Sequence, residues 1–318
     1  MPTFSFSSRK DTVSKLRPVN PLRDLPKIAD LVELCFRQNM DREGQRYIRQ
    51  MRNANQSQNF LQWANSSLPL LGYIWEEEQE IVGNISIVPF KGHSLLANIA
   101  VHPDYRRRGI AHELTQHAMQ HVRKRGAKSI WLHVQEENAP AIHLYESLGF
   151  EARALRTTWN AIENSNHELS DDQPRITTKV ARFWEQQERW LDRAYPPNLR
   201  WYRMPNFQTF APGLQYWLYR LFVETDIRQW AVEKGDDLQA VLTWLPSHTK
   251  RTQLWLATPP QTDARSLAGL LLHARQQLRT RKSELYLDYP AGEHHEAFTQ
   301  AGFTPQRTLL WMEAPGKE

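Results

Sequence analysis

The sequence contains an internal repeat, and this feature restricts the possible folds more than any other. When the chain is shifted by 157 positions, Ile99–Val122 lies over Leu256–Arg279 without a gap, and six of the 24 aligned pairs are identical. After two further deletions of two residues each, Gly149–Phe150 matches Gly302–Phe303. A chain of 318 residues, at roughly 100–200 residues per domain, is expected to hold about two domains. We therefore predict a duplicated domain.

The first half alternates between patterns of strand and helix, which predicts an α/β (α+β) fold. The apolar spacing indicates helices over 22–37, extending to about residue 53, then over 109–125 and from Asn138 to Gly149. Short apolar runs indicate strands over 12–20, 70–75, 81–89, 94–101, 129–134 and 150–159.

A polar stretch divides the two halves. Residues 161–174 are rich in Asn, Ser and Asp and show no periodicity, so we predict a linker there. The expected domains are therefore residues 1–160 and residues 175–318.

Composition excludes several classes of protein. Hydrophobic residues make up 40% and charged residues 24% of the chain, as in ordinary globular proteins. No apolar run approaches the roughly 20 residues of a membrane helix, and the N-terminal residues lack the apolar core of a secretory signal. Cys35 is the only cysteine, so no intrachain disulfide forms and a cytoplasmic location is expected.

The basic excess is confined to one half of the chain. The formal net charge of +5 lies within residues 1–160, while residues 161–318 are neutral overall. This distribution fits either nucleic acid or a small polyanion such as a nucleotide or coenzyme.

The most informative local pattern is a loop between an apolar strand and a helix. The strand ends near Val101, three arginines follow, and the helix begins at Gly109. The first amides of a helix have no intrahelical partner and favour anions. Because Gly109 and Ala111 are small, a ligand can approach the backbone closely. We predict a cradle for a pyrophosphate here, supported by the arginine charges.

Residues 95–150 resemble the core of the GNAT N-acetyltransferase superfamily, and are most similar to bacterial ribosomal-protein alanine N-acetyltransferases. The resemblance rests on three motifs: Asn98–Pro103, Arg106-x-x-Gly109-x-Ala111, and Asn138–Phe150. It implies two tandem GNAT-like domains, each with a mixed, mostly antiparallel twisted sheet flanked by helices. It also implies acetyl-CoA as co-substrate and no metal.

In this superfamily the strand before the loop splays from its neighbour and pairs with the pantetheine arm. The resemblance therefore implies a set of residues that bind acetyl-CoA: Ile99, Ala100, Val101, Arg106, Arg107, Arg108, Gly109, Ile110, Ala111, Asn138 and Tyr145. Asn138 also fits the N-cap of the helix that follows it.

Two residues are candidates for catalysis. Tyr145 stands where the superfamily places its general acid, and a phenol with an ordinary pKa of about 10 holds its proton at neutral pH. His133 occupies the position of a glutamate base in the alanine acetyltransferases, and an imidazole can also accept a proton. It could equally pack as a structural histidine. His93 and the glutamates of Glu76–Glu80 are alternative bases.

The second half lacks these features. The repeat alignment places Asp263, Ser266 and Phe298 where the first half has an arginine, a glycine and a tyrosine of its site. A carboxylate repels a pyrophosphate. We expect residues 175–318 to keep the fold as a degenerate domain without an acetyl-CoA site.

These observations predict an N-acetyltransferase in which an amine attacks the thioester directly in a ternary complex. The acceptor is a protein N-terminus or a small primary amine. A non-catalytic acyl-CoA sensor or interaction module is the alternative, and nucleic-acid binding is a third and weaker hypothesis. We expect no membrane partner and no metal. The helical histidines His112, His117 and His121 lack the acidic partner that a metal site would need.

Overall fold

A computed structural model describes most of the chain. The described residues are 15–37, 40, 42–53, 71–162, 174–213, 226–235, 237–247, 250–281 and 283–317. Contacts divide the chain into two compact units. The first is Met1–His133, Ala139–Glu151 and Met312–Glu318, and the second is Val134–Asn138 and Ala152–Trp311. Most of the expected linker, residues 161–174, lies outside the described residues, and the boundaries at 160 and 175 remain a prediction.

The first unit is built on a mixed sheet in the order β1-β2-β3-β4-β5. Its strands are β1 (Leu16–Pro18), β2 (Leu71–Glu77), β3 (Glu80–Phe90), β4 (His93–Val101) and β5 (Ser129–Gln135). Neighbouring strands are antiparallel except β4 and β5, which are parallel and joined through α4 (Ile110–Lys124). Residues 12–14 of the first predicted strand lie outside the described residues.

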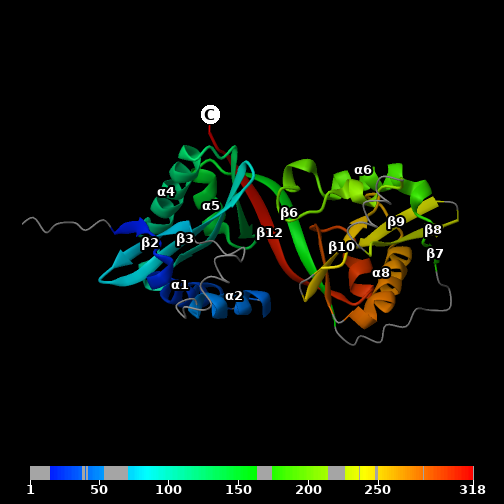
Figure 1. Cartoon of the computed structure of the whole chain (residues 1–318), viewed down its shortest axis with the longest axis horizontal. Coiled ribbons are helices and arrows are strands. Elements are labelled where there is room, and N and C mark those ends of the chain that lie inside the picture. The colour runs from blue at the N-terminus through cyan, green and yellow to red at the C-terminus, as the bar shows by residue number, and fades with distance from the viewer. Residues whose placement is uncertain are drawn as a thin grey trace, which may run out of the picture. The chain divides into compact units, whose positions relative to one another are not determined.

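Helices cover the sheet of the first unit (Figure 1). Besides α4, they are α1 (Pro21–Phe36), α2 (Arg42–Arg52) and α5 (Ala139–Ser147). The helix predicted over 22–37 is α1, and the further helix predicted up to about residue 53 is α2. The amide of Leu22 donates to Asn20 Oδ1 at 3.2 Å, so α1 has a side-chain N-cap. Helices α1 and α2 share an apolar cluster with Ile74, Ile81 and Ala100 of the sheet.

Helix α4 packs closely on the sheet at Gly83. A Cβ at this glycine would lie 2.8 Å from Ile110 Cγ2 and 3.0 Å from Leu114 Cδ1. Ile110 and Leu114 are buried residues of α4. The glycine therefore allows the start of α4 to approach β3, and this start is the predicted anion cradle.

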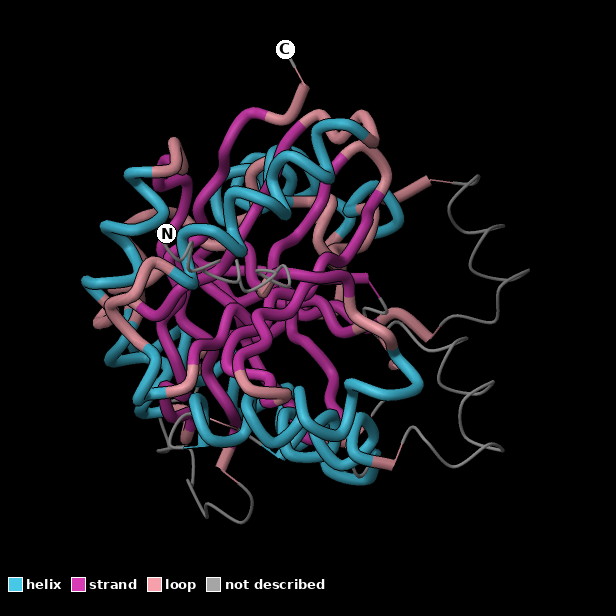
Figure 2. The backbone as a smooth tube through the Cα atoms, turned by 90° about the vertical axis from the view of Figure 1, so that its left-hand side faces the viewer, coloured by secondary structure: helices cyan, strands magenta, loops and turns pink. Residues whose placement is uncertain are grey.

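The second unit repeats this order of elements. Its strands follow the order β12-β6-β11-β10-β9-β8-β7. They are β6 (Glu151–Ala161), β7 (Arg175–Thr177), β8 (Arg228–Lys234), β9 (Asp237–Trp244), β10 (Arg251–Ala257), β11 (Glu284–Pro290) and β12 (Phe303–Pro315). Its helices are α6 (Trp184–Ala194), α8 (Ala264–Leu278) and α9 (His295–Gln300). Helix α8 connects the parallel strands β10 and β11, as α4 connects the parallel strands β4 and β5. Figure 2 distinguishes the strands (magenta) from the helices (cyan) along the backbone.

In each half of the sequence, the last strand or the residues directly after it belong to the compact unit formed by the other half. Strand β6 pairs antiparallel with β11, both within the second unit. The C-terminal residues join the first unit, where the Gly316 amide donates to Lys128 O at 3.0 Å and the Lys317 amide to Ala127 O at 2.9 Å. No described helix is long and apolar enough to cross a membrane.

The contact at Gly83 predicts the effect of a single methyl group. We expect Gly83→Ala to lower the free energy of unfolding by about 1–3 kcal/mol, because the close Cβ contacts overpack the interface between β3 and α4. Urea denaturation measures this change. Gln116→Ala, at an exposed position of α4, serves as the control and should change stability little. Equal stability of wild type and Gly83→Ala would contradict the close packing.

Candidate functional site

The two parallel strands of the first unit separate part of the way along. Strand β4 pairs with β5 from His93↔Ser129 to Leu96↔Leu132. Within the described residues, no pairing between the two strands continues beyond that register. The backbone of β4 from Ala97 onward is therefore open on its β5 side.

A β-bulge lies where the strands separate. Ser86 pairs with Ala97 but Asn84 pairs with Ala100, so β4 carries one extra residue opposite β3. Asn98, in this bulge, has a left-handed φ of +50°. Asparagine tolerates this conformation better than most residues with a side chain. The extra residue changes the direction of β4 and so helps to open the gap.

Polar side chains hold the bulge in place. Asn84 Nδ2 donates to Asn98 O at 2.9 Å, and Asn98 Nδ2 donates to the Tyr47 hydroxyl at 2.9 Å and to Ser86 Oγ at 3.3 Å. Asn84 is completely buried. Burial raises the pKa of Tyr47 to about 12, while the hydrogen bond from Asn98 opposes this shift. The phenol therefore stays neutral, and α2 is linked to the bulge of β4.

The loop after β4 leads into a helix whose start is open. Gly109 precedes α4 with φ +80°, and no side chain caps this helix. Nothing lies within 4 Å of the position that a Cβ of Gly109 would take. Arg107 also has a left-handed φ of +64°. Alternating backbone conformations of this kind turn successive amides toward one concavity, which suits an anion. The predicted cradle thus fits a pyrophosphate in its geometry.

The three arginines of the loop are all exposed, but they differ in their contacts. Arg106 Nε donates to Val101 O at 3.2 Å. Arg108 donates to Asp104 O at 3.0 Å and lies over the Tyr105 ring at 4.7 Å. These bonds stiffen the loop while leaving its positive charge in place.

Val101 at the end of β4 is already engaged. Its carbonyl accepts from Arg106 and also from Cys35 Sγ at 3.4 Å. Burial raises the pKa of the Cys35 thiol, so this cysteine is a weak donor in the core of the first unit. Of the two pairing positions implied for the pantetheine arm, Ile99 lies in the bulge and Val101 has its carbonyl occupied.

Helix α5 carries the predicted acid. Tyr145 is 6% exposed, and burial raises the pKa of its phenol. Within the described residues, no hydrogen bond engages its hydroxyl, and its ring lies 6.0 Å from that of Phe150. Asn138 directly precedes α5 and is exposed. Its backbone amide donates to Gln135 O at 3.0 Å. Gly149, at φ +86°, ends the helix as the sequence predicts.

His133 is the first residue of β5 beyond the last pair with β4, and it is half-buried. The alternative base His93 lies at the paired end of β4. It is the first residue of that strand, where its Nδ1 lies 2.8 Å from Ser129 Oγ. Four residues of strand at roughly 3.3 Å each place it about 13 Å before Ala97, where the open edge begins.

The glutamates of the β2–β3 hairpin are held by other groups. Glu76 pairs with Arg17, and Glu77 pairs with Lys15 at 3.0 Å. A hydrogen bond from Trp75, and then the Lys15 contact, lowers the pKa of Glu77, which weakens it as a base. No group of three or more potential metal ligands occurs in the described part of the chain.

The second unit has the same separation of strands, but its own side chains fill it. Pairing of β10 with β11 stops at Gln253↔Tyr286. The amide of Leu256, which corresponds to Ile99 in the repeat, donates to the Tyr195 hydroxyl at 3.3 Å. Tyr195 is completely buried, and its ring packs against Trp255 with centroids 5.3 Å apart.

The counterpart of the anion cradle is also closed. Asp263 caps α8 by accepting from the Ser266 amide at 2.9 Å and the Ser266 hydroxyl at 2.7 Å. A hydrogen bond from Lys234, followed by those from Ser266, lowers the pKa of Asp263 to about 2. Phe298, at the position of Tyr145, is completely buried and has no proton to donate. Sequence motifs gave no indication of Tyr195, Tyr47 or Asn84, because their partners are distant in the chain.

Comparison with known proteins shows what the first unit is similar to. Residues 27–150 match the model of the acetyltransferase (GNAT) family. Over 64 residues, 20% of this chain, the sequence is 47% identical to the [ribosomal protein bS18]-alanine N-acetyltransferase of Escherichia coli K12. It is 45% identical over 53 residues, 17% of this chain and 16% of the relative, to the mycothiol acetyltransferase of Thermobifida fusca. The chain spans 43% of the length of the bS18-alanine enzyme.

Solved structures match over nearly the whole chain. A GCN5-related N-acetyltransferase from Sphaerobacter thermophilus superposes with a TM-score of 0.59 at 12% identity, covering 96% of this chain and 97% of that one. A tandem GNAT protein from the clavulanic acid biosynthesis pathway superposes with a TM-score of 0.51 at 14% identity, covering 95% and 99%. At this identity the likeness concerns the fold, and the predicted fold of two GNAT-like domains is confirmed.

Two glycines with the same backbone conformation test the cradle. Gly109 and Gly126 both have φ +80° and open space where a Cβ would lie, so alanine strains each site by about 1–2 kcal/mol. We expect Gly109→Ala to weaken coenzyme A binding about tenfold, because the added Cβ enters the open space beside the backbone that a bound pyrophosphate would occupy. Gly126→Ala, which lies after α4, should retain wild-type affinity. Isothermal titration calorimetry measures both, and equal affinities for the two variants would contradict the assignment of the cradle.

Proposed function

We propose that the first unit is an N-acetyltransferase that moves an acetyl group from acetyl-CoA to a primary amine. The observation that carries this proposal is the open edge of β4, which leads directly into the uncapped start of α4 at Gly109. An extended amide-containing chain ending in a pyrophosphate requires such a continuous track of backbone donors and acceptors.

Each part of the site has a role in holding acetyl-CoA. The amides between Arg106 and Ala111 bind the pyrophosphate, and the arginine side chains add positive charge. The open edge of β4 around Ile99, with Ala100 and Val101, pairs with the pantetheine arm. The Val101 carbonyl takes no part in this pairing, because it already accepts from Arg106 and Cys35. Asn138 contacts the same arm from the start of α5.

The transfer is a direct displacement. The neutral amine nitrogen attacks the thioester carbon, so that a C–N bond forms and the C–S bond breaks. His133 accepts the proton that the amine loses, directly or through water. Tyr145 donates its proton to the departing sulfur, which leaves as a thiol. Both side chains return to their starting protonation states by exchange with solvent.

The acceptor is a protein N-terminal amine or a small primary amine. The similarity to the bS18-alanine enzyme, at 47% identity over 64 residues, favours a protein N-terminus. The second unit has its strand gap and helix start closed by Tyr195 and Asp263. We infer that it binds no acetyl-CoA, so one equivalent should saturate the full chain in calorimetry.

Removal of the Tyr145 hydroxyl distinguishes a role in catalysis from a role in coenzyme A binding. We expect Tyr145→Phe to lower kcat at least about tenfold, because a positioned general acid is generally worth about 10²-fold or more. Coenzyme A affinity should persist, since the ring remains. Thiol release with an alanine-starting peptide of bS18 type, or with small amines, measures the rate. Tyr73→Phe, another buried tyrosine of this unit, is the control. Binding without turnover by the wild type would instead identify a non-catalytic acyl-CoA sensor.

The pH profile follows from the raised pKa of Tyr145. The phenol keeps its proton up to at least about pH 10. The rate should therefore rise as the amine loses its proton, and then remain level instead of falling. His133→Gln should lower the rate most near neutral pH and least near about pH 10, where more of the amine is already neutral. An alkaline fall below about pH 9 that disappears in Tyr145→Phe would contradict the raised pKa.

A further inference from the structure

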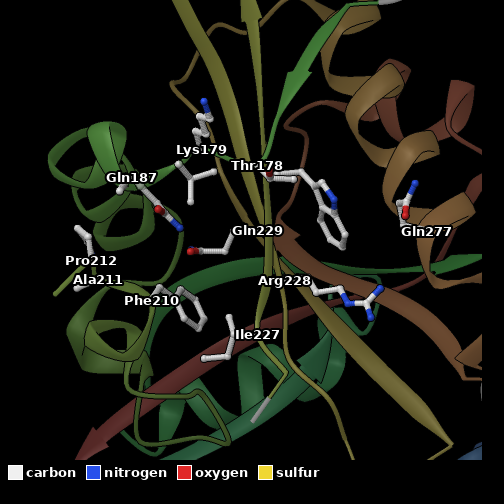
Figure 3. A pocket seen from close by; sticks show the side chains of 13 residues that line it. Thr178, Lys179, Gln187, Phe210, Ala211, Pro212, Ile227, Arg228, Gln229 and Gln277 are labelled. Carbon is white, nitrogen blue, oxygen red and sulfur yellow. The ribbon is translucent and has the colours of Figure 1, made fainter. Parts of the chain in front are cut away.

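The second unit contains a cavity that the proposed chemistry does not use. Its volume is about 590 Å³, within the range of ligand sites. Residues from several elements line it, among them Lys179, Gln187, Phe210, Arg228, Gln229 and Trp230. Figure 3 shows these elements meeting around β8.

The cavity lies where the sheet edge loses its last strand. Strand β7 pairs with β8 only from Arg175↔Glu233 to Thr177↔Ala231. On its other side, β8 pairs with β9 from Arg228 onward. Within the described residues, the outer edge of β8 at 228–230 therefore has no partner strand. Since successive residues of a strand direct their backbone groups to alternate sides, at least one of these residues presents its N–H and C=O outward.

The lining residues surround this edge from both faces of the sheet. In Figure 3, Gln229 points toward Gln187 and Phe210, whereas Arg228 points to the other side, where Gln277 lies. The cavity includes both groups. Among the described residues, the cavity therefore borders the stretch of β8 that has no partner strand.

Polar groups at the cavity are buried and oriented. Gln187 is 1% exposed, and its Nε2 donates to Thr243 Oγ1 at 3.2 Å. Gln229 Nε2 also donates to Thr243 Oγ1 at 3.2 Å. The two carboxamide oxygens accept no hydrogen bond from a described residue, so both can accept from a ligand N–H.

The charge at the cavity is mainly positive. Lys179 is exposed and forms no ion pair with the described residues. Arg228 pairs with Asp226 at 3.1 Å. Phe210 and Trp230 supply apolar surface, being 2% and 4% exposed. The site thus combines an open backbone edge, amide acceptors, apolar walls and an exposed cation.

We propose that this edge of β8 binds an extended, acidic peptide segment by adding it as a further strand. Backbone hydrogen bonds along the edge hold the segment, alternate side chains enter the cavity, and a carboxylate contacts Lys179. This proposal goes beyond acetyl transfer and does not depend on it, because the site lies wholly within the second unit.

The test uses the full chain and a fluorescein-labelled octapeptide of alternating Val and Glu. Its twin carries N-methyl groups on alternate amides, which removes backbone donors without changing the side chains. Fluorescence anisotropy should show that the twin binds at least about tenfold more weakly. Equal binding of the two peptides, or no binding of either, would overturn the proposal. In that event the charged side chains near this edge of β8 would serve only to prevent the edge from pairing with other chains and aggregating.

Matched variants locate the binding. Lys179→Glu should weaken the octapeptide about fivefold, since it replaces an attraction with a repulsion. Lys250→Glu changes an exposed lysine outside the cavity by the same charge and should bind as the wild type does. Thermal unfolding of both variants controls for folding. If both variants lose affinity equally, the binding is non-specific and the proposal fails. Dimerisation measured by sedimentation, with the peptide failing to compete, would identify a second copy as the occupant and would also overturn it.

Discussion

The site of this protein depends on the bulge in β4. One extra residue, with Asn98 in a left-handed conformation, turns the strand away from β5 just after their last pair. A backbone edge that leaves a sheet inside a domain must find other partners, because unpaired buried amides and carbonyls are costly. In the first unit, no described residues of β5 pair with β4 beyond Leu96, and we propose that a ligand with amide groups takes the place of a strand there. The proposed chemistry at Tyr145 and His133 requires the gap to exist.

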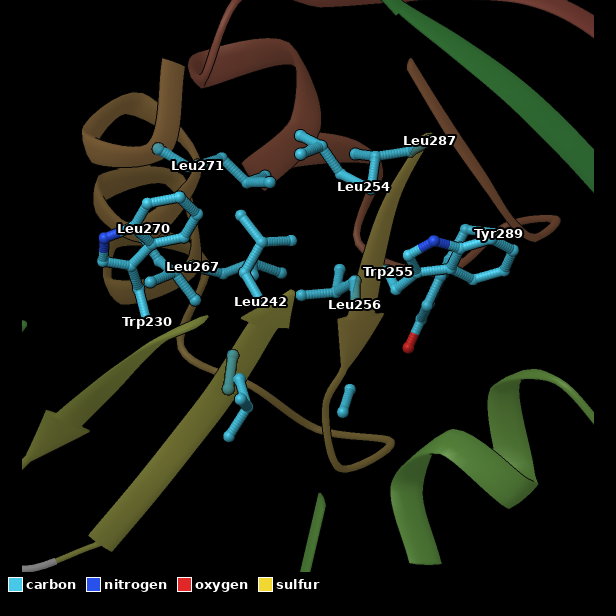
Figure 4. Close-up of a cluster of buried hydrophobic side chains, with 14 of the residues drawn as sticks. Trp230, Leu242, Leu254, Trp255, Leu256, Leu267, Leu270, Leu271, Leu287 and Tyr289 are labelled. Carbon is cyan, nitrogen blue, oxygen red and sulfur yellow. The ribbon is translucent and has the colours of Figure 1, made fainter. Parts of the chain in front are cut away.

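The second unit shows the other solution to the same constraint. Its strands also separate, but the Tyr195 hydroxyl accepts from the free amide of Leu256. Figure 4 shows Trp255 and Tyr289 on one side of β10 and leucines of α8 on the opposite side. Both aromatic rings lie against Tyr195, with centroids 5.3 Å and 6.1 Å away. The start of α8 is satisfied by its own aspartate at position 263. The same topology therefore produces a potential binding site or a packed core, and a few side chains decide which.

Much of the first unit could be predicted from local sequence. The positions of α4 and α5, the glycine at the start of one and at the end of the other, and the strand before the loop all follow from spacing and turn chemistry. The helix predicted over 22–37 and the further helix predicted up to about residue 53 correspond to α1 and α2. His93 was considered as a base because sequence gives residue type but not the end of a strand at which a residue faces a site. Its contact with Ser129 places it at the closed end.

The sequence by itself determined the repeat, the glycine turn at Gly109 and the absence of that turn in the second half, because these are properties of consecutive residues. Only the tertiary structure decided which backbone edges remain open. The Asn84–Asn98–Tyr47 network joins three separate elements, and Tyr195 reaches β10 from 61 residues away in the chain. Hydrogen bonds between such distant residues depend on how the elements pack, and local pattern carries no information about that packing.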